Sequence, residues 1–233
     1  MKSAFKSPRA DEIDAPRRSW SRGVRVISVT FIVIWGCAVS TGLWILWGYE
    51  NRPGVSAQAP AVWPADSRIQ RARERATLVM LAHPHCPCTR ASIGELASLM
   101  AHTQGRVTAY VLFLKPEGFS EDWEKTDLWQ SASRIPGVSA VIDDGGVEAR
   151  RFHAATSGQT ILYDAEGRLM FSGGITASRG HAGDNAGRSS IVALAGGDGA
   201  AAEQAETETF VFGCPLFDKE SECQKPGHET DEH

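Results

Sequence analysis

The stretch His83–Ser92, which reads HPHCPCTRAS, holds the residue types in this sequence that are best suited to chemistry. Cys86 and Cys88 stand one residue apart, where a short apolar run gives way to a segment with helical periodicity. A cysteine in the first turn of a helix meets unpaired backbone N–H groups and the positive end of the helix dipole, and both favour the thiolate. Because a thiolate attacks disulfides, the stretch predicts a thiol–disulfide exchange site with Cys86 as the attacking sulfur.

A second sulfur must complete such a site, and the sequence offers two. Cys88 is adjacent, but a Cys-x-Cys bridge closes a small ring whose strain makes the bond easily reduced. Cys214 lies in the apolar segment 208–217, ETFVFGCPLF, which alternates as a strand does and could return to the sheet beside the motif. Both alternatives stay open, and the candidate catalytic residues are Cys86, Cys88 and Cys214.

The same stretch also fits a metal site. His83, His85, Cys86 and Cys88 are soft and borderline donors that suit Cu(I) or Zn(II), so copper is the alternative cofactor. Alternating residues at a strand end seldom converge on one ion, however, and the two histidines could instead add positive charge beside the thiolate. His181, in a glycine-rich loop, could serve as a further ligand or as a base, although a lone loop histidine is commonly just solvated.

A structural role for the cysteines is the third alternative. Cys86 or Cys88 could form a permanent disulfide with Cys214 or Cys223, and the domain would then be a non-catalytic scaffold that binds a partner. Cys37 is different, because it lies in a long apolar segment and is interpreted as a small apolar residue there.

The elements around the motif alternate between strand and helix patterns. ATLVMLA (76–82) predicts a buried strand, and the apolar periodicity after it predicts a helix starting near Cys88 or Thr89. Strands are expected over 106–115 and 138–143, followed by a hairpin whose two strands flank the turn Asp164–Gly167. Helices are expected near 128–135, 147–154 and 189–194. The order β-α-β-(α)-β-α-β-β-α predicts an α/β fold with a mixed sheet.

Residues 76–195 resemble a thioredoxin-like domain of the membrane-anchored periplasmic type. The resemblance is carried by the strand TLVMLA, by the cysteine motif directly before a helix, and by the hairpin segment TILYDAEGRLMFSGG. It is closest to the group of bacterial proteins named RedB. The resemblance implies a thioredoxin-like fold, a central mixed sheet flanked by helices, and an oxidoreductase whose partners are protein thiols or disulfides.

Two positions depart from the pattern of that family. Members usually carry Cys-x-x-Cys followed by Arg; here Cys86 and Arg90 match, Thr89 takes the place of the second cysteine, and Cys88 comes one residue early. Arg90 is expected to help stabilise the thiolate. The family's cis-proline corresponds to Gly158, so substrate docking is expected to differ from the ordinary thioredoxin manner.

An N-terminal segment predicts how the protein is placed in the cell. Residues 26–48 contain no charged side chain, and 23 residues suffice to cross a hydrocarbon core of about 30 Å. Basic residues predominate before this segment, so the positive-inside rule predicts a single-pass helix in the inner membrane with the following domain in the periplasm or outside. A signal peptide cleaved near residues 55–57 is the alternative, but its apolar region would typically be shorter, about 7–15 residues.

Net charge limits the classes of function, and the order of segments predicts the domain organisation. The formal net charge of −4 provides no basic field, so nucleic acid is not an expected partner, whereas the lipid membrane is. Residues 49–75 are expected to form a spacer that ends in a short polar helix. The predicted organisation is a cytoplasmic basic tail (1–25), a transmembrane helix (26–48), an extracytoplasmic linker (49–75), a thioredoxin-like domain (76–195), and an acidic linker and C-terminal tail with Cys214 (196–233).

Overall fold

The computed structural model describes residues 22–55, 57–120, 122–197 and 199–217. The chain divides into two compact units, with the boundary between Leu46 and Trp47. The first unit contains most of helix α1 (Arg22–Glu50). Within α1, the 28 residues Gly23–Glu50 have a mean hydropathy of 2.0, so this helix is long and apolar enough to cross a membrane, a test that a signal sequence would also pass. The single helix expected over 26–48 is confirmed.

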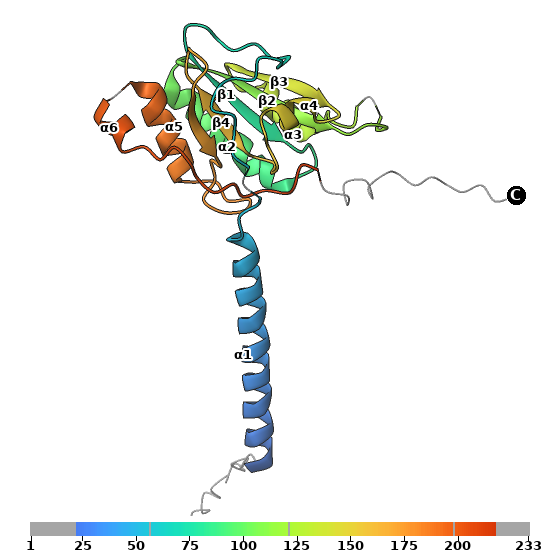
Figure 1. Ribbon diagram of the computed structural model, residues 1–233. Coiled ribbons are helices and arrows are strands. Elements are labelled where there is room, and N and C mark those ends of the chain that lie inside the picture. The colour runs from blue at the N-terminus through green and yellow to red at the C-terminus, as the bar shows by residue number, and fades with distance from the viewer. Residues whose placement is uncertain (1–21, 56, 121, 198, 218–233) are drawn as a thin grey trace, which may run out of the picture. The chain divides into compact units, whose positions relative to one another are not determined.

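The second unit is built on a five-stranded sheet in the order β3-β2-β1-β4-β5 (Figure 1). Strands β1, β2 and β3 are parallel, whereas β4 is antiparallel to both β1 and β5. This mixed sheet is the thioredoxin-like arrangement that the sequence predicts. The strands are β1 (Ala76–Ala82), β2 (Val107–Lys115), β3 (Val138–Asp144), β4 (Thr160–Tyr163) and β5 (Leu169–Gly173).

Helices cover the sheet close to the expected places. The one unexpected helix in the described chain is the short α6. The longest helix of the second unit, α2, begins one residue earlier than the earlier of the two expected starts. Proline is favoured at the first position of a helix, because its N–H would be unpaired there and its φ is already suitable, which explains a start at Pro87. The helices are α2 (Pro87–Thr103), α3 (Asp127–Ser133), α4 (Val147–Arg151), α5 (Ala186–Gly196) and α6 (Gly199–Glu203).

Each face of the sheet carries its own apolar core. One core packs α2, α3 and α5 against the sheet and includes the fully buried Leu96 and Leu99. The other includes Phe152, which follows α4, and Tyr163 from β4. Two buried cores of this kind hold the central strand β1 rigidly, so its end is a fixed platform for the motif that follows.

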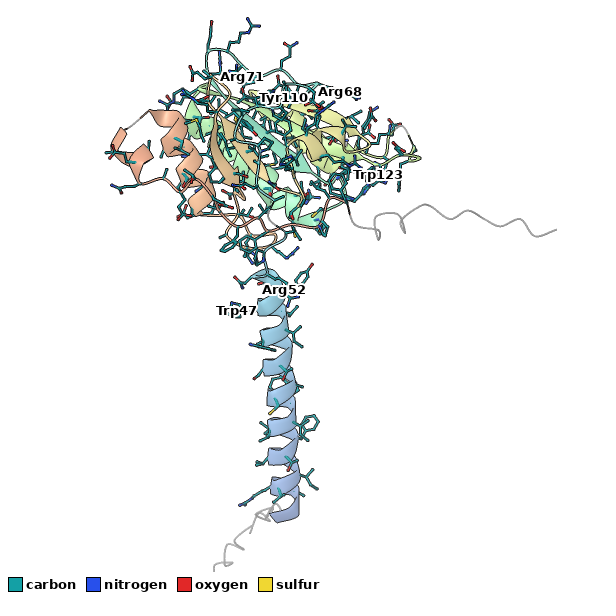
Figure 2. The ribbon with its side chains drawn as sticks, viewed as in Figure 1. Trp47, Arg52, Arg68, Arg71, Tyr110 and Trp123 are labelled. Carbon is teal, nitrogen blue, oxygen red and sulfur yellow. The ribbon has the colours of Figure 1, made fainter. Side chains whose placement is uncertain are left out.

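The segment before β1 does not form the short helix that the sequence predicts. No helix forms over residues 68–75, and the chain instead lies on the second core. The Trp63 ring packs edge-on against Phe152 and Tyr163, at centroid distances of 5.1 and 5.3 Å. Tyr110, labelled in Figure 2, donates from its hydroxyl to the Gln70 carbonyl at 3.0 Å. Apolar side chains in this stretch therefore gain more from burial than its polar residues would gain from a solvated helix.

The C-terminal segment, residues 206–217, is irregular but closely attached. Thr207 accepts a hydrogen bond from the Ser172 backbone on the outer strand β5, and Glu208 forms an isolated parallel bridge there. Farther along, Pro215 forms an antiparallel bridge with Thr156. The segment returns to the sheet as the sequence predicts, but through isolated bridges rather than as a regular strand.

Candidate active site

Three cysteine sulfurs gather where β1 ends and α2 begins. The Cys86 and Cys214 sulfurs are 2.8 Å apart, although the two residues are separated by 128 positions in the sequence. The sulfurs of Cys86, Cys88 and Cys214 all lie within 4.8 Å of one another. All three are free thiols. Both alternatives for the second sulfur, Cys88 and Cys214, are thus within reach of Cys86, and Cys214 is in direct contact with it.

The end of β1 and the start of α2 fix the position of Cys86. The His83 backbone N–H donates to the Ser157 hydroxyl at 2.8 Å, which ties the end of β1 to the loop before β4. Cys86 is the N-cap residue of α2, with extended backbone angles, and its carbonyl accepts from the Thr89 backbone. Its sulfur therefore stands at the positive end of a helix dipole, where a thiolate is stabilised.

Backbone pairing holds Cys214 in place. The Ser157 N–H donates to the Cys214 carbonyl at 2.8 Å, and the Leu216 N–H donates to the Ala155 carbonyl at 2.9 Å. Gly213 makes this approach possible, because a Cβ atom there would overlap the Ser157 carbonyl. The buried Leu216 side chain then anchors the segment in the second core. The short stretch 213–216 thus pairs with the loop at 155–157 much as an added strand pairs with the edge of a sheet.

The three thiols differ sharply in acidity. A hydrogen bond from the Cys214 thiol, and then one from Cys88, hold the pKa of Cys86 far below its usual value, although burial opposes this shift. The bonds to Cys86 and Cys88, together with burial, raise the pKa of Cys214 well above its usual value. The pKa of Cys88 is also raised, because its contact with Cys86 and its burial outweigh the lowering effect of Cys214. These directions make Cys86 the most acidic of the three sulfurs, with the thiols of Cys214 and Cys88 beside it.

Accessibility and acidity are found on different sulfurs. Only 2% of Cys86 and 7% of Cys88 are exposed, whereas Cys214 is partly exposed. Cys214 is therefore the most exposed of the three cysteines.

The environments of His83 and His85 differ from those that the sequence predicts. Burial lowers the pKa of His83, and this outweighs the opposing charge of Cys86, so His83 supplies no positive charge to the thiolate. Its Nδ1 atom accepts from the His85 N–H at 3.2 Å. His85 is exposed, and its Nε2 atom lies 3.1 Å from the Trp123 carbonyl oxygen. Among the described residues, neither histidine belongs to the group of donor atoms that the three cysteines form.

Of two arginines near the site, one differs from expectation and the other was not expected there. Arg90 is exposed and pairs with Asp127 on α3 instead of with a sulfur. Arg179, which the sequence did not single out, donates from Nη1 to the Gly213 carbonyl at 2.6 Å, directly before Cys214. Its charge acts on Cys88, whose pKa it lowers slightly against the net rise. Arg179 therefore lies beside Cys214 in the sequence-distant part of the site, and its charge acts on Cys88.

Other predicted positions lie away from the sulfurs or outside the described residues. His181 is exposed, and its ring Nδ1 lies 2.8 Å from the Arg179 carbonyl oxygen in its own loop. Cys37 is in α1, and Cys223 falls outside the described residues. At the position of the family's proline, Gly158 has φ of +90°, a conformation that favours glycine, and the described chain contains no cis peptide bond.

Sequence reasoning missed the residues that support the site. Ser157 bonds through its hydroxyl to the His83 backbone and to the Thr89 hydroxyl, and through its N–H to Cys214. Trp123, labelled in Figure 2, packs against the rings of His83 and His85 from the loop after β2. Ser157 directly precedes Gly158, which the sequence did single out, whereas nothing in the sequence marks Trp123 or Arg179.

Comparisons with known proteins support the fold. No protein-family model matches the chain, and the search of curated proteins found no match. Among solved structures, an uncharacterized conserved protein from Geobacillus kaustophilus is 20% identical, with a TM-score of 0.51 over 73% of this chain and 95% of that one. A hypothetical protein from Sinorhizobium meliloti 1021 is 18% identical, with a TM-score of 0.54 over 70% of this chain and 96% of that one. A weaker likeness, with a TM-score of 0.33 and 19% identity, is to the thioredoxin domain of a thiol-disulfide oxidoreductase from Bacteroides vulgatus, over 43% and 70% of the two chains.

Proposed function

We propose that the protein is a membrane-anchored, extracytoplasmic thiol–disulfide oxidoreductase whose exchanging pair is Cys86 and Cys214. The observation that carries this proposal is the contact of their two sulfurs, at 2.8 Å, on a thioredoxin-like fold. A disulfide between them forms by exchange: one sulfur is first held in a mixed disulfide with an oxidised partner, and the thiolate of the other attacks it and releases the partner's thiolate. The contact of the two sulfurs allows that attack. A Cys86–Cys88 bridge would instead close the small ring of a Cys-x-Cys motif, which strain disfavours.

The acidity of Cys86 indicates the direction of exchange. A stabilised thiolate favours the reduced form of the pair, and a pair whose reduced form is stabilised is a strong oxidant of other thiols. Cys86 is also the better leaving group, since a thiol of lower pKa leaves faster. The oxidised pair is therefore proposed to accept electrons from the thiols of partner proteins.

The partly exposed Cys214 is the sulfur that meets the substrate. A substrate thiolate attacks Cys214 Sγ of the disulfide; the Cys214–substrate bond forms, and Cys86 leaves as a thiolate with the bonding electron pair. A second substrate thiolate then attacks the substrate sulfur of this mixed disulfide, which forms the substrate disulfide and releases Cys214 as a thiolate that takes up a proton. Two substrate thiols are oxidised and the two protein cysteines are reduced, so electrons balance.

The location is part of the same proposal. The apolar helix α1 and the basic residues before it support a single-pass anchor in the inner membrane, with the second unit in the periplasm. Disulfides persist in that compartment, as the proposed oxidised form requires. The placement in the RedB group is likewise proposed, on the motif and the hairpin that suggest it.

The test uses the oxidised full-length chain in detergent micelles, mixed with a peptide that carries two thiols. We expect the peptide to be oxidised, and we expect Cys86→Ser and Cys214→Ser each to lower the rate by about 100-fold or more, since either variant lacks the disulfide. Cys37→Ser is the matched control and should behave as the unchanged protein. Acid quenching should trap the peptide on Cys214, as mapped by mass spectrometry.

Two results would contradict the proposal. Activity that survives in Cys214→Ser but is lost in Cys88→Ser would identify Cys86 and Cys88 as the exchanging pair. Equal rates in all variants would show that the cysteines are not catalytic, as in the scaffold alternative.

A further inference from the structure

The three sulfurs form a second kind of site when the pair is reduced. We propose that Cys86, Cys88 and Cys214 together bind one Cu(I) ion through three thiolates. This proposal goes beyond the exchange reaction and does not depend on it. It differs from the copper site that the sequence suggests, because Cys214 replaces both histidines.

The donor set selects the class of metal. The three sulfurs lie within 4.8 Å of one another, and over the described residues the group that they form includes no carboxylate oxygen and no imidazole nitrogen. Soft thiolate ligands suit Cu(I), whereas Mg²⁺ and Ca²⁺ require oxygen ligands. Structural Zn²⁺ sites are almost always four-coordinate, so a set of three favours the metal that accepts three-coordination, which is Cu(I).

The surroundings of the sulfurs also suit a bound Cu(I) ion. Cys86 and Cys88 are buried, so water has little access to an ion between them. Cys214 is carried on an irregular stretch held by a few backbone bonds, which lets its sulfur adjust from contact with Cys86 to the spacing that a shared ion requires. Three thiolates and one Cu(I) carry a net charge of −2, and the Arg179 guanidinium, bonded to the Gly213 carbonyl, lies on the side of the site where it offsets part of that charge.

Metal binding and disulfide formation exclude each other, because both need Cys86 and Cys214. When a partner's disulfide oxidises the site, the Cys86–Cys214 bond forms, the electron pair passes to the partner, and the partner's disulfide becomes two thiolates. Copper remains Cu(I) throughout and loses two of its three ligands. The redox state of the pair therefore controls whether the ion is held.

The test titrates the reduced full-length chain with Cu(I) under anaerobic conditions, in competition with a chromophoric Cu(I) chelator. We expect one ion per chain, and no competitive binding by the oxidised chain. Cys88→Ser and Cys214→Ser should each weaken binding by more than about 100-fold, because loss of a ligand should exceed the 10–100-fold effect of losing a residue that only supports one. Cys37→Ser should bind as the unchanged protein does. X-ray absorption should show three sulfur neighbours around the copper in the unchanged protein.

Several outcomes would overturn the copper proposal. Unchanged affinity in Cys214→Ser, fewer than three sulfur neighbours, or competitive binding of Zn²⁺ without Cu(I) would each do so, and the absorption measurement does not depend on how well a variant folds. Peptide oxidation by the metal-free protein is measured separately. Exchange without Cu(I) binding would remove only the copper proposal, whereas Cu(I) binding without exchange would remove only the proposed function.

Discussion

The motif at 83–90 and the C-terminal segment at 206–217 bring sulfurs to the same point by different means. The motif is local: β1 ends in a buried core, Pro87 opens α2, and Cys86 and Cys88 follow from that geometry. The C-terminal segment has no regular structure of its own and is held by a backbone bond to β5, by two backbone bonds to the loop at 155–157, and by the buried Leu216 side chain.

This difference assigns different tasks to the two regions. A sulfur at the N-cap of α2 keeps its position as long as the domain is folded, so its thiolate remains stabilised. Moving the sulfur of Cys214 breaks the few hydrogen bonds of its stretch, each worth about 0.5–1.5 kcal/mol net, and disturbs the buried Leu216, but it does not require the domain to unfold. The reactive sulfur is thus fixed, and the sulfur that meets partners can be displaced.

The largest effect is expected where the C-terminal segment touches the loop most closely. Gly213→Ala places a methyl group on the Ser157 carbonyl, so residues 213–215 must move away. We expect the equilibrium constant for the Cys86–Cys214 disulfide, measured in glutathione buffers, to fall by about 100-fold, which corresponds to about 2.7 kcal/mol.

Gly94→Ala is the matched control, because an added Cβ there meets nothing within 4 Å and lies within α2. It should leave the disulfide equilibrium unchanged. If Gly213→Ala also left it unchanged, the close approach of the segment would not be what holds Cys214 at the motif.

The next effect concerns the acidity of Cys86. Its pKa is lowered first of all by the Cys214 thiol, so Cys214→Ala should raise that pKa by about one unit or more, equivalent to at least about 1.4 kcal/mol. Because the folded pKa is depressed, the thiolate disappears only as the pH falls through that low value, and in the variant it should disappear at a higher pH. The ultraviolet absorbance of the thiolate follows this change.

In the control Cys37→Ala, the midpoint of the Cys86 thiolate titration should equal that of the unchanged protein. An identical midpoint in Cys214→Ala would show that the helix end and Cys88 alone set the acidity of Cys86, and that the C-terminal segment contributes nothing to it.

The same contrast explains what could be predicted from the sequence. Strand 76–82, the helix after it and the hairpin follow from periodicity and turn residues, which act over a few positions. Cys214 could be named as a candidate from its apolar surroundings, but its contact with Cys86, on which the proposed pair rests, depends on backbone pairing with residues about 60 positions away. The roles given to Arg90 and His83 were wrong for a related reason, since Asp127 and burial act on them through the tertiary structure.

The next substitution should weaken the hydrogen bonds of the motif but leave the C-terminal segment in place. Ser157→Ala removes the hydroxyl that bonds to the His83 N–H and the Thr89 hydroxyl, both buried, but keeps the backbone N–H that bonds to Cys214. We expect the free energy of unfolding to fall by about 1–3 kcal/mol in thermal or denaturant unfolding. The disulfide equilibrium should change less than about twofold.

Ser131→Ala is the control for removing a hydroxyl, because its hydrogen bond on α3 is exposed. It should change the stability by no more than about 0.5 kcal/mol. A large change in the disulfide equilibrium of Ser157→Ala would show that the two regions are coupled through this side chain and are not held independently.

The smallest expected change in free energy concerns Arg179, whose side chain bonds the C-terminal segment just before Cys214. Arg179→Ala removes the hydrogen bond to the Gly213 carbonyl, for an expected loss of about 1 kcal/mol and a disulfide equilibrium constant about fivefold lower. Arg168→Ala is the matched control, since that arginine is exposed and pairs with Asp164 in the hairpin. Equal disulfide equilibria in the two variants would mean that backbone pairing alone positions Cys214. A drop confined to Arg179→Ala would show that the C-terminal segment also depends on a long side chain from the loop after β5, which the motif does not need.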